Sequence, residues 1–380
     1  MKSIPAYRLN DTNTSLAYPG MGLKGANSSN KNMLTQEGAS FTFRMKGNFN
    51  PDNPTDWEDK KESLIGASLQ TWTGTGLEVS IPFGVLPLST SGKYRKLSGY
   101  SFIGDGAVNP DGTHAAIDLN IDFKVSDVIN NSHWRKSGEA TLYDANSHVL
   151  EAKDINGNYA ASKFDPYLKR VLSSATNVRY NGFAYSGAEE VSGNLFLGGG
   201  VVTSLATIDE GSAHTGQYAL AVNAGQKGFS FEATDLKPEA TYLVYCWTNN
   251  PAQTKIRYEI DGNLQPESSA TIKNMGQVGD WHQLRATINV PANTTIAKFF
   301  VQAGSQNIRV DDFLVRPIDA GFTGYVYNQW GELSDIINAN NLSTHYEYDD
   351  MGRLKSVWTE SFQYGKRQIS ENTIKYIDQN

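Results

Sequence analysis

The strongest constraint on this chain is a short motif that recurs at a fixed spacing. An aromatic residue followed by Asn or Asp occurs at Tyr327-Asn328 and again, 21 residues later, at Tyr348-Asp349. The same pattern occurs upstream at Tyr143-Asp144 and, again 21 residues on, at Phe164-Asp165. A period of roughly 20 residues is typical of a β array rather than a helical solenoid. The sequence therefore predicts short β-hairpins that stack on their neighbours.

Turn-forming residues lie between the recurring motifs. Residues 154–157 (Asp-Ile-Asn-Gly) begin ten positions before Phe164, and residues 338–341 (Asn-Ala-Asn-Asn) begin ten positions before Tyr348. Gly and Asn adopt positive φ at little cost, and short polar side chains bond the nearby backbone. Each unit is therefore expected to run strand, turn, strand, turn. One unit alone cannot bury its apolar face, so neighbouring units must pair.

The segment from Tyr348 to Leu354 resembles the Rhs or YD-repeat family, whose signature is Tyr-Asp-x-x-Gly-Arg-Leu. All five signature positions are present: Tyr348, Asp349, Gly352, Arg353 and Leu354. The segment that starts at Phe164 departs from the signature, with Leu168 where Gly is usual. The resemblance implies a spiralling β-sheet shell in a secreted or surface-exposed bacterial protein. The alternative is a generic β-hairpin with a chance Tyr-Asp pair.

Composition excludes several classes of protein. Only 19% of residues are charged, while Gly (35) and Tyr (19) are frequent, which is typical of a folded, turn-rich β protein rather than a disordered one. A net charge of −7 argues against nucleic-acid binding. Cys246 is the single cysteine, so neither a disulfide framework nor a cysteine zinc site is expected. No apolar run reaches the ~18 residues of a membrane span, and the N-terminus lacks an apolar signal core.

We predict an all-β chain in which a YD-repeat sheet is interrupted by a β-sandwich jelly roll. The only helix-like window is 54–69, and residues 117–123 alternate strictly as a half-buried strand does. The edges at 35–44 and 362–377 are expected to pair with further repeats of a longer protein or with a partner chain. The predicted segments are a polar N-terminal segment (1–40), a β-rich and degenerate shell or separate small β domain (41–141), YD repeats (142–182), the jelly-roll insert (183–318), YD repeats (319–360), and a C-terminal strand or truncated repeat (361–380).

The insert resembles the galactose-binding-like jelly rolls that serve as carbohydrate-binding modules. About eight strands without helical periodicity favour a β-sandwich over this length. The features that carry the resemblance follow one another at residues 188–189, 213–220, 236–247, 279–284 and 310–313.

Alternation along 242–249 predicts two faces for one strand. Tyr242, Val244 and Cys246 share one face, and Tyr245 and Trp247 lie on the other. If the first face is core, the second could stack on sugar rings, as the concave side of sugar-binding jelly rolls does. The alternative is that these rings pack against the adjoining repeats or under a loop. The predicted sugar-binding residues are Tyr245, Trp247, Tyr258, Phe300 and Gln302.

The jelly-roll resemblance also implies one structural calcium ion. The matching carboxylates are Glu189, Asp209 and either Asp311 or Asp312. Such oxygen ligands, drawn from distant strands, would join the edges of the sandwich. No other cofactor is expected.

The sequence shows little sign of catalysis. Residues 20–25 spell Gly-x-Gly-x-x-Gly, but no strand precedes and no helix follows, so a nucleotide site is not predicted. The six histidines are scattered, and Asp144, Asp165 and Asp349 are interpreted as turn formers. The predicted function is a non-enzymatic structural fragment of a large secreted or cell-surface YD-repeat protein, with the jelly roll as spacer or binding domain. The alternatives are glycan recognition at the cell surface and a shell segment of a polymorphic toxin.

Overall fold

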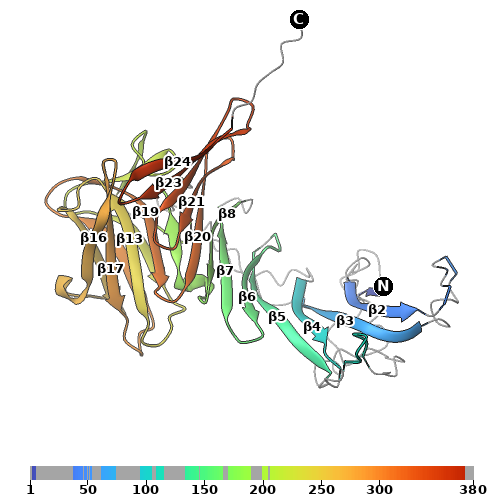
Figure 1. Cartoon of the computed structure of the whole chain (residues 1–380). Helices are drawn as coiled ribbons and strands as arrows, with labels where there is room; N and C mark the ends of the chain where they lie inside the picture. The colour runs from blue at the N-terminus through green and yellow to red at the C-terminus, as the bar shows by residue number, and fades with distance from the viewer. Residues whose placement is uncertain are drawn as a thin grey trace, which may run out of the picture. The chain divides into compact units, whose positions relative to one another are not determined.

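The computed structural model confirms an all-β chain. It describes residues 2–5, 37–45, 47–48, 50, 52–53, 61–73, 95–104, 108–114, 133–144, 146–165, 170–189, 199–203 and 206–372. Within these ranges the chain forms strands β1 to β24 and two 3-10 turns, without an α-helix (Figure 1). No helix in the described chain therefore has the length and apolar character to cross a membrane. The predicted strand at 117–123 and the glycine motif at 20–25 lie outside the described residues.

The chain divides into two compact units, Met1–Gly157 and Asn158–Asn380. The first unit is an antiparallel sheet in the order β1-β2-β3-β4-β5-β6. A small core of Phe41, Leu64, Leu69 and Tyr100 lies within it. Its strands are β1 (Lys2–Pro5), β2 (Glu37–Met45), β3 (Lys61–Thr73), β4 (Arg95–Phe102), β5 (Trp134–Tyr143) and β6 (Val149–Asp154).

Three features of this first unit were not indicated by the sequence. The helix-like window 54–69 lies partly in β3, which pairs with β2 on one side and β4 on the other. Burial of Leu64 and Leu69 in the core of the sheet therefore overrides the weak helical pattern. The polar N-terminal segment (1–40) contributes a strand, because β1 pairs with β2. For the same reason residues 35–44 are not a free edge.

The second unit begins with a sheet of short antiparallel strands, here called the hairpin sheet. Its order is β7-β8-β20-β21-β22-β23-β24. Thr176 of β8 lies opposite Gly321 of β20, and Ser173 lies opposite Gly324. The chain therefore leaves the sheet after β8 and returns in the neighbouring strand, which confirms that the two hairpin segments are adjacent. The strands are β7 (Tyr159–Phe164), β8 (Val171–Thr176), β20 (Gly321–Tyr327), β21 (Leu333–Asn338), β22 (Ser343–Tyr348), β23 (Leu354–Ser361) and β24 (Gly365–Glu371).

A β-sandwich lies between these two segments of chain. Its large sheet has the order β10-β11-β19-β13-β17-β16, with β9 also paired to β19, and its small sheet has the order β12-β18-β14-β15. The elements are η1 (Tyr180–Gly182), β9 (Ala184–Ser186), β10 (Thr207–Glu210), β11 (Tyr218–Val222), β12 (Lys227–Ala233), β13 (Thr241–Thr248), β14 (Thr254–Ile260), β15 (Asn263–Leu264), η2 (Glu267–Ser269), β16 (Thr271–Val278), β17 (Trp281–Asn289), β18 (Ala297–Ala303) and β19 (Ile308–Pro317).

The predicted faces of β13 are confirmed. Tyr242, Val244 and Cys246 point into the core between the two sandwich sheets, while Tyr245 and Trp247 lie in other clusters on the opposite face. Burial raises the pKa of the Cys246 thiol to about 12, so this cysteine is an inert core residue.

The recurring Asn and Asp residues form turns, as predicted. Asp349 Oδ1 accepts hydrogen bonds from the backbone N–H groups of Met351 and Arg353 (3.0 and 2.9 Å). Asn328 and Asn338 bond the second and fourth residues after them in the same way. The side chain thus holds the tight turn that ends each hairpin. Asp144 Oδ1 makes the same pair of bonds, and Asp165 Oδ1 accepts from the N–H of residue 170.

The tyrosine of each motif has a separate role. The Tyr348 hydroxyl donates to the carbonyl of Leu333 (2.8 Å), and the Tyr327 hydroxyl donates to the carbonyl of Val171 (3.0 Å). Tyr143 donates to the carbonyl of Lys96 in the first unit. In each case the acceptor lies at or near the start of an earlier strand. The aromatic residue therefore ties its hairpin to preceding strands, while Asn or Asp closes the turn.

Gly352 supplies the positive φ (72°) that ends one of these turns. We expect Gly352→Ala to lower the free energy of unfolding by about 1–2 kcal/mol, because a Cβ disfavours left-handed backbone. An added Cβ would also lie 2.8 Å from a Glu332 carboxylate oxygen. Chemical denaturation measures the change. Gly66→Ala is the control, because its φ is not left-handed and nothing lies within 4 Å of an added Cβ. Equal effects of the two substitutions would contradict the prediction.

Candidate functional site

The outer face of the large sandwich sheet is covered by the hairpin sheet. Tyr245, on β13, has only 2% of its surface exposed. It lies in one apolar cluster with Phe322 and Val326 of β20 and Ile337 of β21. Figure 1 shows these hairpin strands beside β19 and β13. Segments far apart in sequence therefore share one core at this junction.

The turn at residues 338–341, between β21 and β22, fills the part of the face around Trp247 and Gln283. The indole N–H of Trp247 donates to the carbonyl of Asn341 (2.8 Å). Gln283 Nε2 donates to the carbonyls of both Asn340 and Asn341 (2.9 Å each). In return Asn341 Nδ2 donates to the carbonyl of Asp312 (2.7 Å). Groups of the sandwich face thus bind a peptide turn of the same chain.

Arg316 adds a charged contact to the same turn. Its Nε and Nη2 atoms both donate to the carbonyl of Ala339 (3.1 and 2.8 Å). Its Nη1 atom donates to carbonyls at the end of β19 and before β20, including Ala320 (2.9 Å). Arg316 is buried, and each nitrogen of its guanidinium donates to a backbone carbonyl, as buried donors require.

The predicted sugar site is wrong in position. Trp247 is completely buried, and Tyr245 is nearly so, so neither ring can stack on a sugar in the folded chain. The alternative, that these rings pack against the adjoining hairpins, is confirmed. Tyr258 points into the sandwich core with Phe299. Phe300 and Gln302 lie on the small sheet rather than beside β13, with the Phe300 ring under Lys227 Nζ at 4.0 Å. The five residues therefore do not form one site.

His214 is the centre of a buried charged cluster at the same junction. Its Nδ1 atom lies 2.6 Å from Asp312 Oδ2, on β19. Its Nε2 atom lies 3.2 Å from Glu360 Oε1, on β23, without the alignment of a hydrogen bond, so this contact is an ion pair. The ring stacks on Trp247, with centroids 3.8 Å apart and planes 17° apart. One imidazole thus connects the sandwich to the hairpin sheet.

His214 is protonated at neutral pH. Burial alone would lower the pKa of its imidazole, but the contacts with Asp312 and Glu360 raise this pKa to about 9. The same imidazolium lowers the pKa of Glu360 against the opposing effect of burial. Charge and stacking therefore act together, because a cation over an indole face is attracted to the ring.

Asp311 and Asp312 are also engaged by donors from the chain. Asp311 Oδ2 accepts from the backbone N–H groups of His214 and Thr215 (2.8 and 3.3 Å). Asp312 Oδ1 accepts from the hydroxyls of Tyr185 and Thr215 (2.6 and 2.8 Å). Asp312 has a φ of +46°, in a stretch where the pairing of β19 with β13 shifts register. Burial, and then the Asp312 charge, raise the pKa of Asp311 well above its usual range.

The predicted calcium ligands are not brought together. Glu189 Oε1 accepts from the backbone N–H groups of Gln217 and Tyr218 (2.8 and 2.7 Å), and burial raises its pKa to about 8. Asp209 lies on β10, in an ion pair with Arg309. Within the described chain no three His, Cys, Asp or Glu side chains are arranged to hold a metal. The calcium ion itself, implied by the resemblance, stays a prediction. The positive charge beside Asp312 comes from His214.

Glu360 and the pair Asp335–His345 were not predicted. His345 Nδ1 lies 2.9 Å from Asp335 Oδ1, and Asp335 is completely buried in the hairpin sheet. The sequence held one usable signal. Two consecutive aspartates in the apolar run 308–315 predict buried carboxylates, which need a cation or several N–H donors. It did not indicate which of the scattered histidines supplies the charge.

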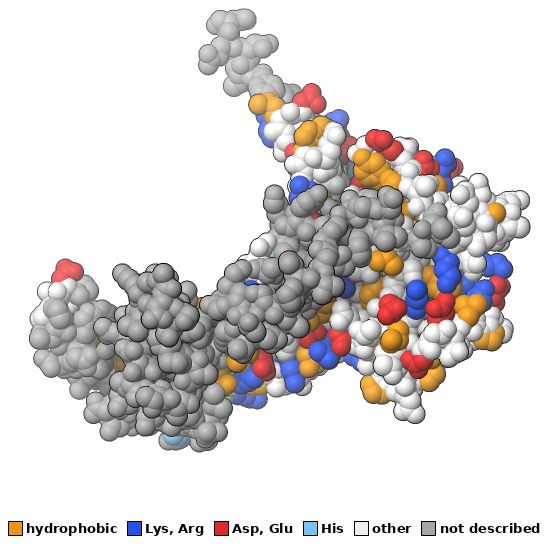
Figure 2. Space-filling model, turned by 180° about the vertical axis from the view of Figure 1, so that it is seen from behind, with side chains coloured by type: hydrophobic (Ala, Val, Ile, Leu, Met, Phe, Trp, Pro, Cys, Tyr) orange, Lys and Arg blue, Asp and Glu red, His pale blue; other side chains and the backbone are white. Residues whose placement is uncertain are grey.

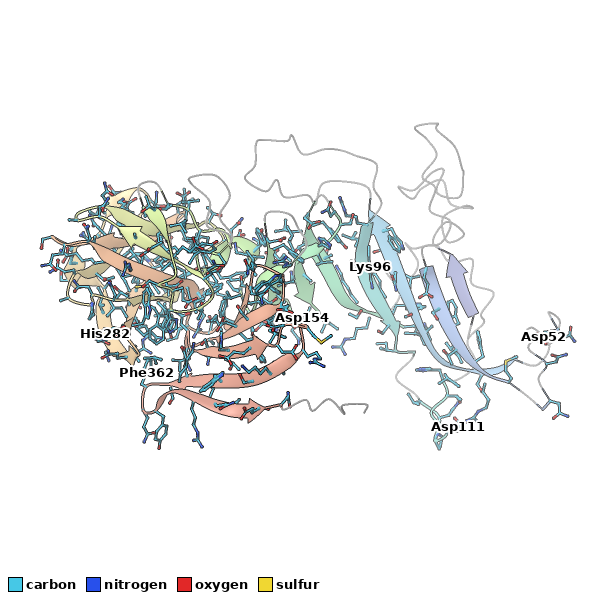
Figure 3. The ribbon with its side chains drawn as sticks, turned by 90° about the horizontal axis from the view of Figure 1, so that it is seen from above. Asp52, Lys96, Asp111, Asp154, His282 and Phe362 are labelled. Atoms are coloured by element: carbon cyan, nitrogen blue, oxygen red, sulfur yellow. The ribbon has the colours of Figure 1, made fainter. Side chains whose placement is uncertain are left out.

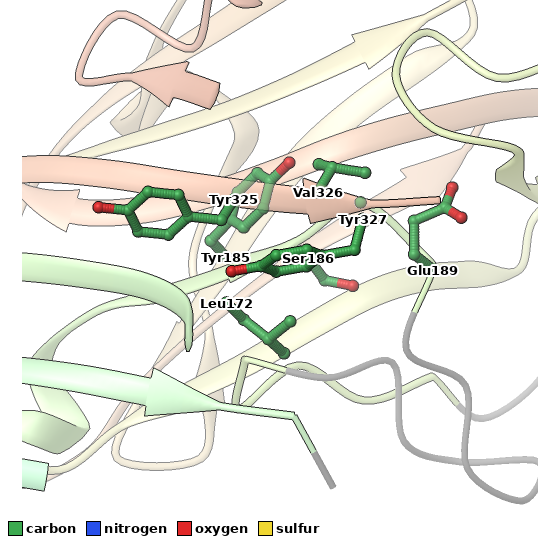
Figure 4. A pocket seen from close by; sticks show the side chains of 8 residues that line it. Leu172, Tyr185, Ser186, Glu189, Tyr325, Val326 and Tyr327 are labelled. Carbon is green, nitrogen blue, oxygen red and sulfur yellow. The ribbon is translucent and has the colours of Figure 1, made fainter. Parts of the chain in front are cut away.

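A small pocket lies beside this cluster, between the sandwich and the hairpin sheet. Leu172, Tyr185 and Glu189 line it together with residues 325–327 of β20 (Figure 4). Its volume of about 10 Å³ is room for roughly one water molecule. It is too small for a sugar ring.

Phe362 closes the junction at the end of β23 (Figure 3). Its ring lies 6.1 Å from that of Trp247. A Cβ added to Gly276 of β16 would lie 2.4 Å from the Phe362 ring, so the two strands approach as closely as Gly permits. Trp247 is thus enclosed by His214 on one side and by the hairpin sheet on others.

No family model and no curated protein matches this sequence. Among solved structures, the chain is similar to carbohydrate-binding modules over roughly a third of its length. One is the CBM22-1 xylan-binding domain of Paenibacillus barcinonensis Xyn10C, with 16% identity, 37% of this chain, 96% of that one and a TM-score of 0.27. Another is the C-terminal CBM6 of LamC from Zobellia galactanivorans, with 12% identity, 35% of this chain, 98% of that one and a TM-score of 0.23. These values give no information on what this chain binds.

Proposed function

We propose that this chain is a non-catalytic structural part of a large secreted or cell-surface protein of the Rhs or YD-repeat kind. In this proposal the sandwich is a rigid body mounted on the hairpin sheet. The observation that carries it is the sandwich face around Trp247, which is filled by the turn at 338–341 of the same chain. A face filled in this way joins the sandwich to the hairpin sheet.

The recurring hairpin contacts support the repeat kind. Tyr327 and Tyr348 each bond a carbonyl near the start of an earlier strand, and each is followed by an Asn or Asp that closes a turn. These contacts recur with the 21-residue spacing of the sequence. A unit that ties itself to earlier strands can be extended by further units. β24 is the last strand in the order of the described hairpin sheet, and we propose that another repeat pairs with it.

The titratable groups of the junction support a structural role rather than catalysis. His214, Asp311, Asp312 and Glu360 are all buried, and each contacts other groups of the protein. A general acid or base must lie within hydrogen-bond reach of a substrate, and these buried side chains do not lie where a substrate could reach them.

On the face shown in Figure 2, acidic and basic side chains are interspersed over the described surface and do not form patches of one charge.

Hydrogen exchange of the full chain, followed by mass spectrometry, tests whether the sandwich is rigidly attached to the hairpin sheet. Peptides from β13, β19 and the 338–341 turn are expected to exchange together, in one cooperative opening, because they share a core and a set of buried hydrogen bonds. Exposed β15 is the internal reference for fast exchange. Opening of the 338–341 turn while β13 and β19 remain protected would contradict the proposal.

A further inference from the structure

The sheet face that binds the 338–341 turn continues past that turn into an open groove. Trp247 of β13, which bonds the turn, lies opposite Asp311 of β19. Asn249 and Arg309 lie two residues away from them along the same two strands, and therefore on the same face. Both line a groove of about 380 Å³ that extends over β10 and β11. One continuous face thus has a filled part and an open part.

The open part offers the same kinds of donor as the filled part. Asn249 Oδ1 accepts from the backbone N–H of Arg309 (2.8 Å), and Asn307 Oδ1 accepts from the N–H of Ala224 (2.9 Å), so both amides have fixed orientations. Their amino groups meet no acceptor among the described residues. Arg309 pairs with Asp209 and keeps 45% of its side chain exposed. Amide and guanidinium donors are also what hold the backbone carbonyls of the 338–341 turn.

A second turn of the chain has the same build as the turn that is already bound. Residues 144–147 read Asp-Ala-Asn-Ser, and residues 338–341 read Asn-Ala-Asn-Asn. Asp144 Oδ1 accepts from the N–H groups of the second and fourth residues after it (2.8 Å each), as Asn338 Oδ1 does (2.8 and 3.3 Å). Ser147 and Asn341, which end the two turns, both have positive φ (73° and 59°). The turns thus share a sequence pattern, a set of hydrogen bonds and a left-handed last residue.

The 144–147 turn is small and open to solvent. Asn146 and Ser147 are both exposed. The groove has the short side chain of Ala221 in its floor, which leaves room for a turn without large side chains. Three other turns that begin with Asn or Asp carry a bulky exposed side chain: Ile155, Trp330 and Met351. Among these turns, 144–147 is therefore the one that matches the bound turn in size as well as in hydrogen bonding.

We propose that this groove binds the 144–147 turn of a second copy of the chain. Asn249, Asn307 and Arg309 of one copy donate to carbonyls of the turn of the next copy, as the filled part of the face does within one copy. The contact is heterologous, because it joins a groove to a turn. Each pair of copies keeps one free groove and one free turn, so that association continues into a filament or closes into a ring. This inference goes beyond the structural role proposed above, and neither depends on the other.

Sedimentation velocity of the full chain, from about 10 µM to about 1 mM, tests the contact. The average mass is expected to rise with concentration. Arg309→Gln in the groove and Asn146→Trp in the turn are each expected to weaken association about tenfold or more, the first by loss of a charged donor and the second by bulk. Asn263→Ala on the small sheet and Asn156→Trp in the neighbouring turn are the matched controls at exposed positions, and both should associate like the parent.

A mixture of the Arg309→Gln and Asn146→Trp variants tests whether the contact is heterologous. The first variant keeps an intact turn and the second an intact groove. The mixture is therefore expected to form dimers with one copy of each, which do not grow, at a concentration where either variant alone stays monomeric. A parent chain that is monomeric at about 1 mM would overturn the proposal. Association that either variant leaves unchanged would place the contact elsewhere, such as at β24, and would overturn it too.

NMR of the parent chain gives a readout that does not depend on any variant's stability. The side-chain NH2 signals of Asn249 and Asn307 are expected to shift as the protein concentration rises, while those of Asn263 and the indole signal of Trp247 stay fixed. A shift of Trp247 in place of the two amides would mean that the second copy displaces the bound turn, which would contradict the proposal. The hydrogen-exchange result for the attachment of the sandwich would be unaffected by any of these outcomes.

Discussion

Replacement of His214 by alanine is expected to lower the free energy of unfolding of the unit that holds the sandwich and the hairpin sheet by about 3–5 kcal/mol. His214 is the cation between Asp312 and Glu360, both of which are almost wholly buried. Removal of one partner from a buried ionic contact leaves the other charges desolvated and uncompensated. The change also removes the ring stacked on Trp247. Urea denaturation followed by tryptophan fluorescence measures the loss.

His282→Ala is the matched control for this prediction. His282 lies on β17 of the large sandwich sheet and is partly exposed; it is labelled in Figure 3. Its replacement is expected to change the free energy of unfolding by roughly 0.5 kcal/mol or less, as for most surface positions. A loss for His214→Ala no larger than that for His282→Ala would show that the buried ion pairs do not hold the junction.

The contribution of His214 to the stability of the same unit is expected to fall by an amount on the order of 3 kcal/mol as the pH rises from about 6.5 to 9. Lys163 acts in the opposite direction over part of this range, because burial lowers the pKa of its ammonium group to about 7, so the contribution of His214 is measured as the difference between the parent protein and His214→Gln. The pKa of His214 is about 9 in the folded chain, against an ordinary value of 6.5. A raised folded pKa means that the native state holds its proton more tightly than the unfolded state. The resulting stability is fully present below pH 6.5 and is lost as the pH rises through 9.

Other groups at the junction alter the profile in known directions. Glu189, with a folded pKa of about 8, binds its proton more tightly when folded, so stability also declines as it ionises. Glu360, whose pKa is lowered in the folded chain, has the opposite effect: the stability that it contributes is lost as the pH falls. Urea midpoints between pH 5 and 10 measure the profile. His214→Gln should flatten the alkaline limb, and an unchanged slope in this variant would exclude His214 as its source.

Local chemistry made much of the fold predictable. Tyr348 and Asp349 mark a strand end and a turn because an Asp side chain can bond the next backbone N–H groups whatever lies around it. Alternation along β13 separated Val244 and Cys246 from Tyr245 and Trp247, because side chains of a strand point to opposite faces. Both expectations are confirmed.

The side-chain contacts between the sandwich and the hairpin sheet were not predictable in detail. Alternation shows that Trp247 and Tyr245 share a face, but not what covers that face, so the same pattern was compatible with a sugar site and with a buried junction. The pairing of His214 with Glu360 depends on the end of β23 lying against the sandwich, which no local signal in the sequence indicates. The helix-like window at 54–69 failed for a related reason, since pairing with two neighbouring strands outweighs a weak local pattern.

The indole N–H of Trp247 provides the most direct measurement of whether the chain fills its own sandwich face. In protein labelled with ¹⁵N-tryptophan, with this signal assigned by Trp247→Phe, its exchange with deuterium can be followed in the full chain. The hydrogen bond to the Asn341 carbonyl and the complete burial of the ring predict exchange only on global opening of the unit. Exchange at the rate of an exposed indole would show that the 338–341 turn does not occupy this face.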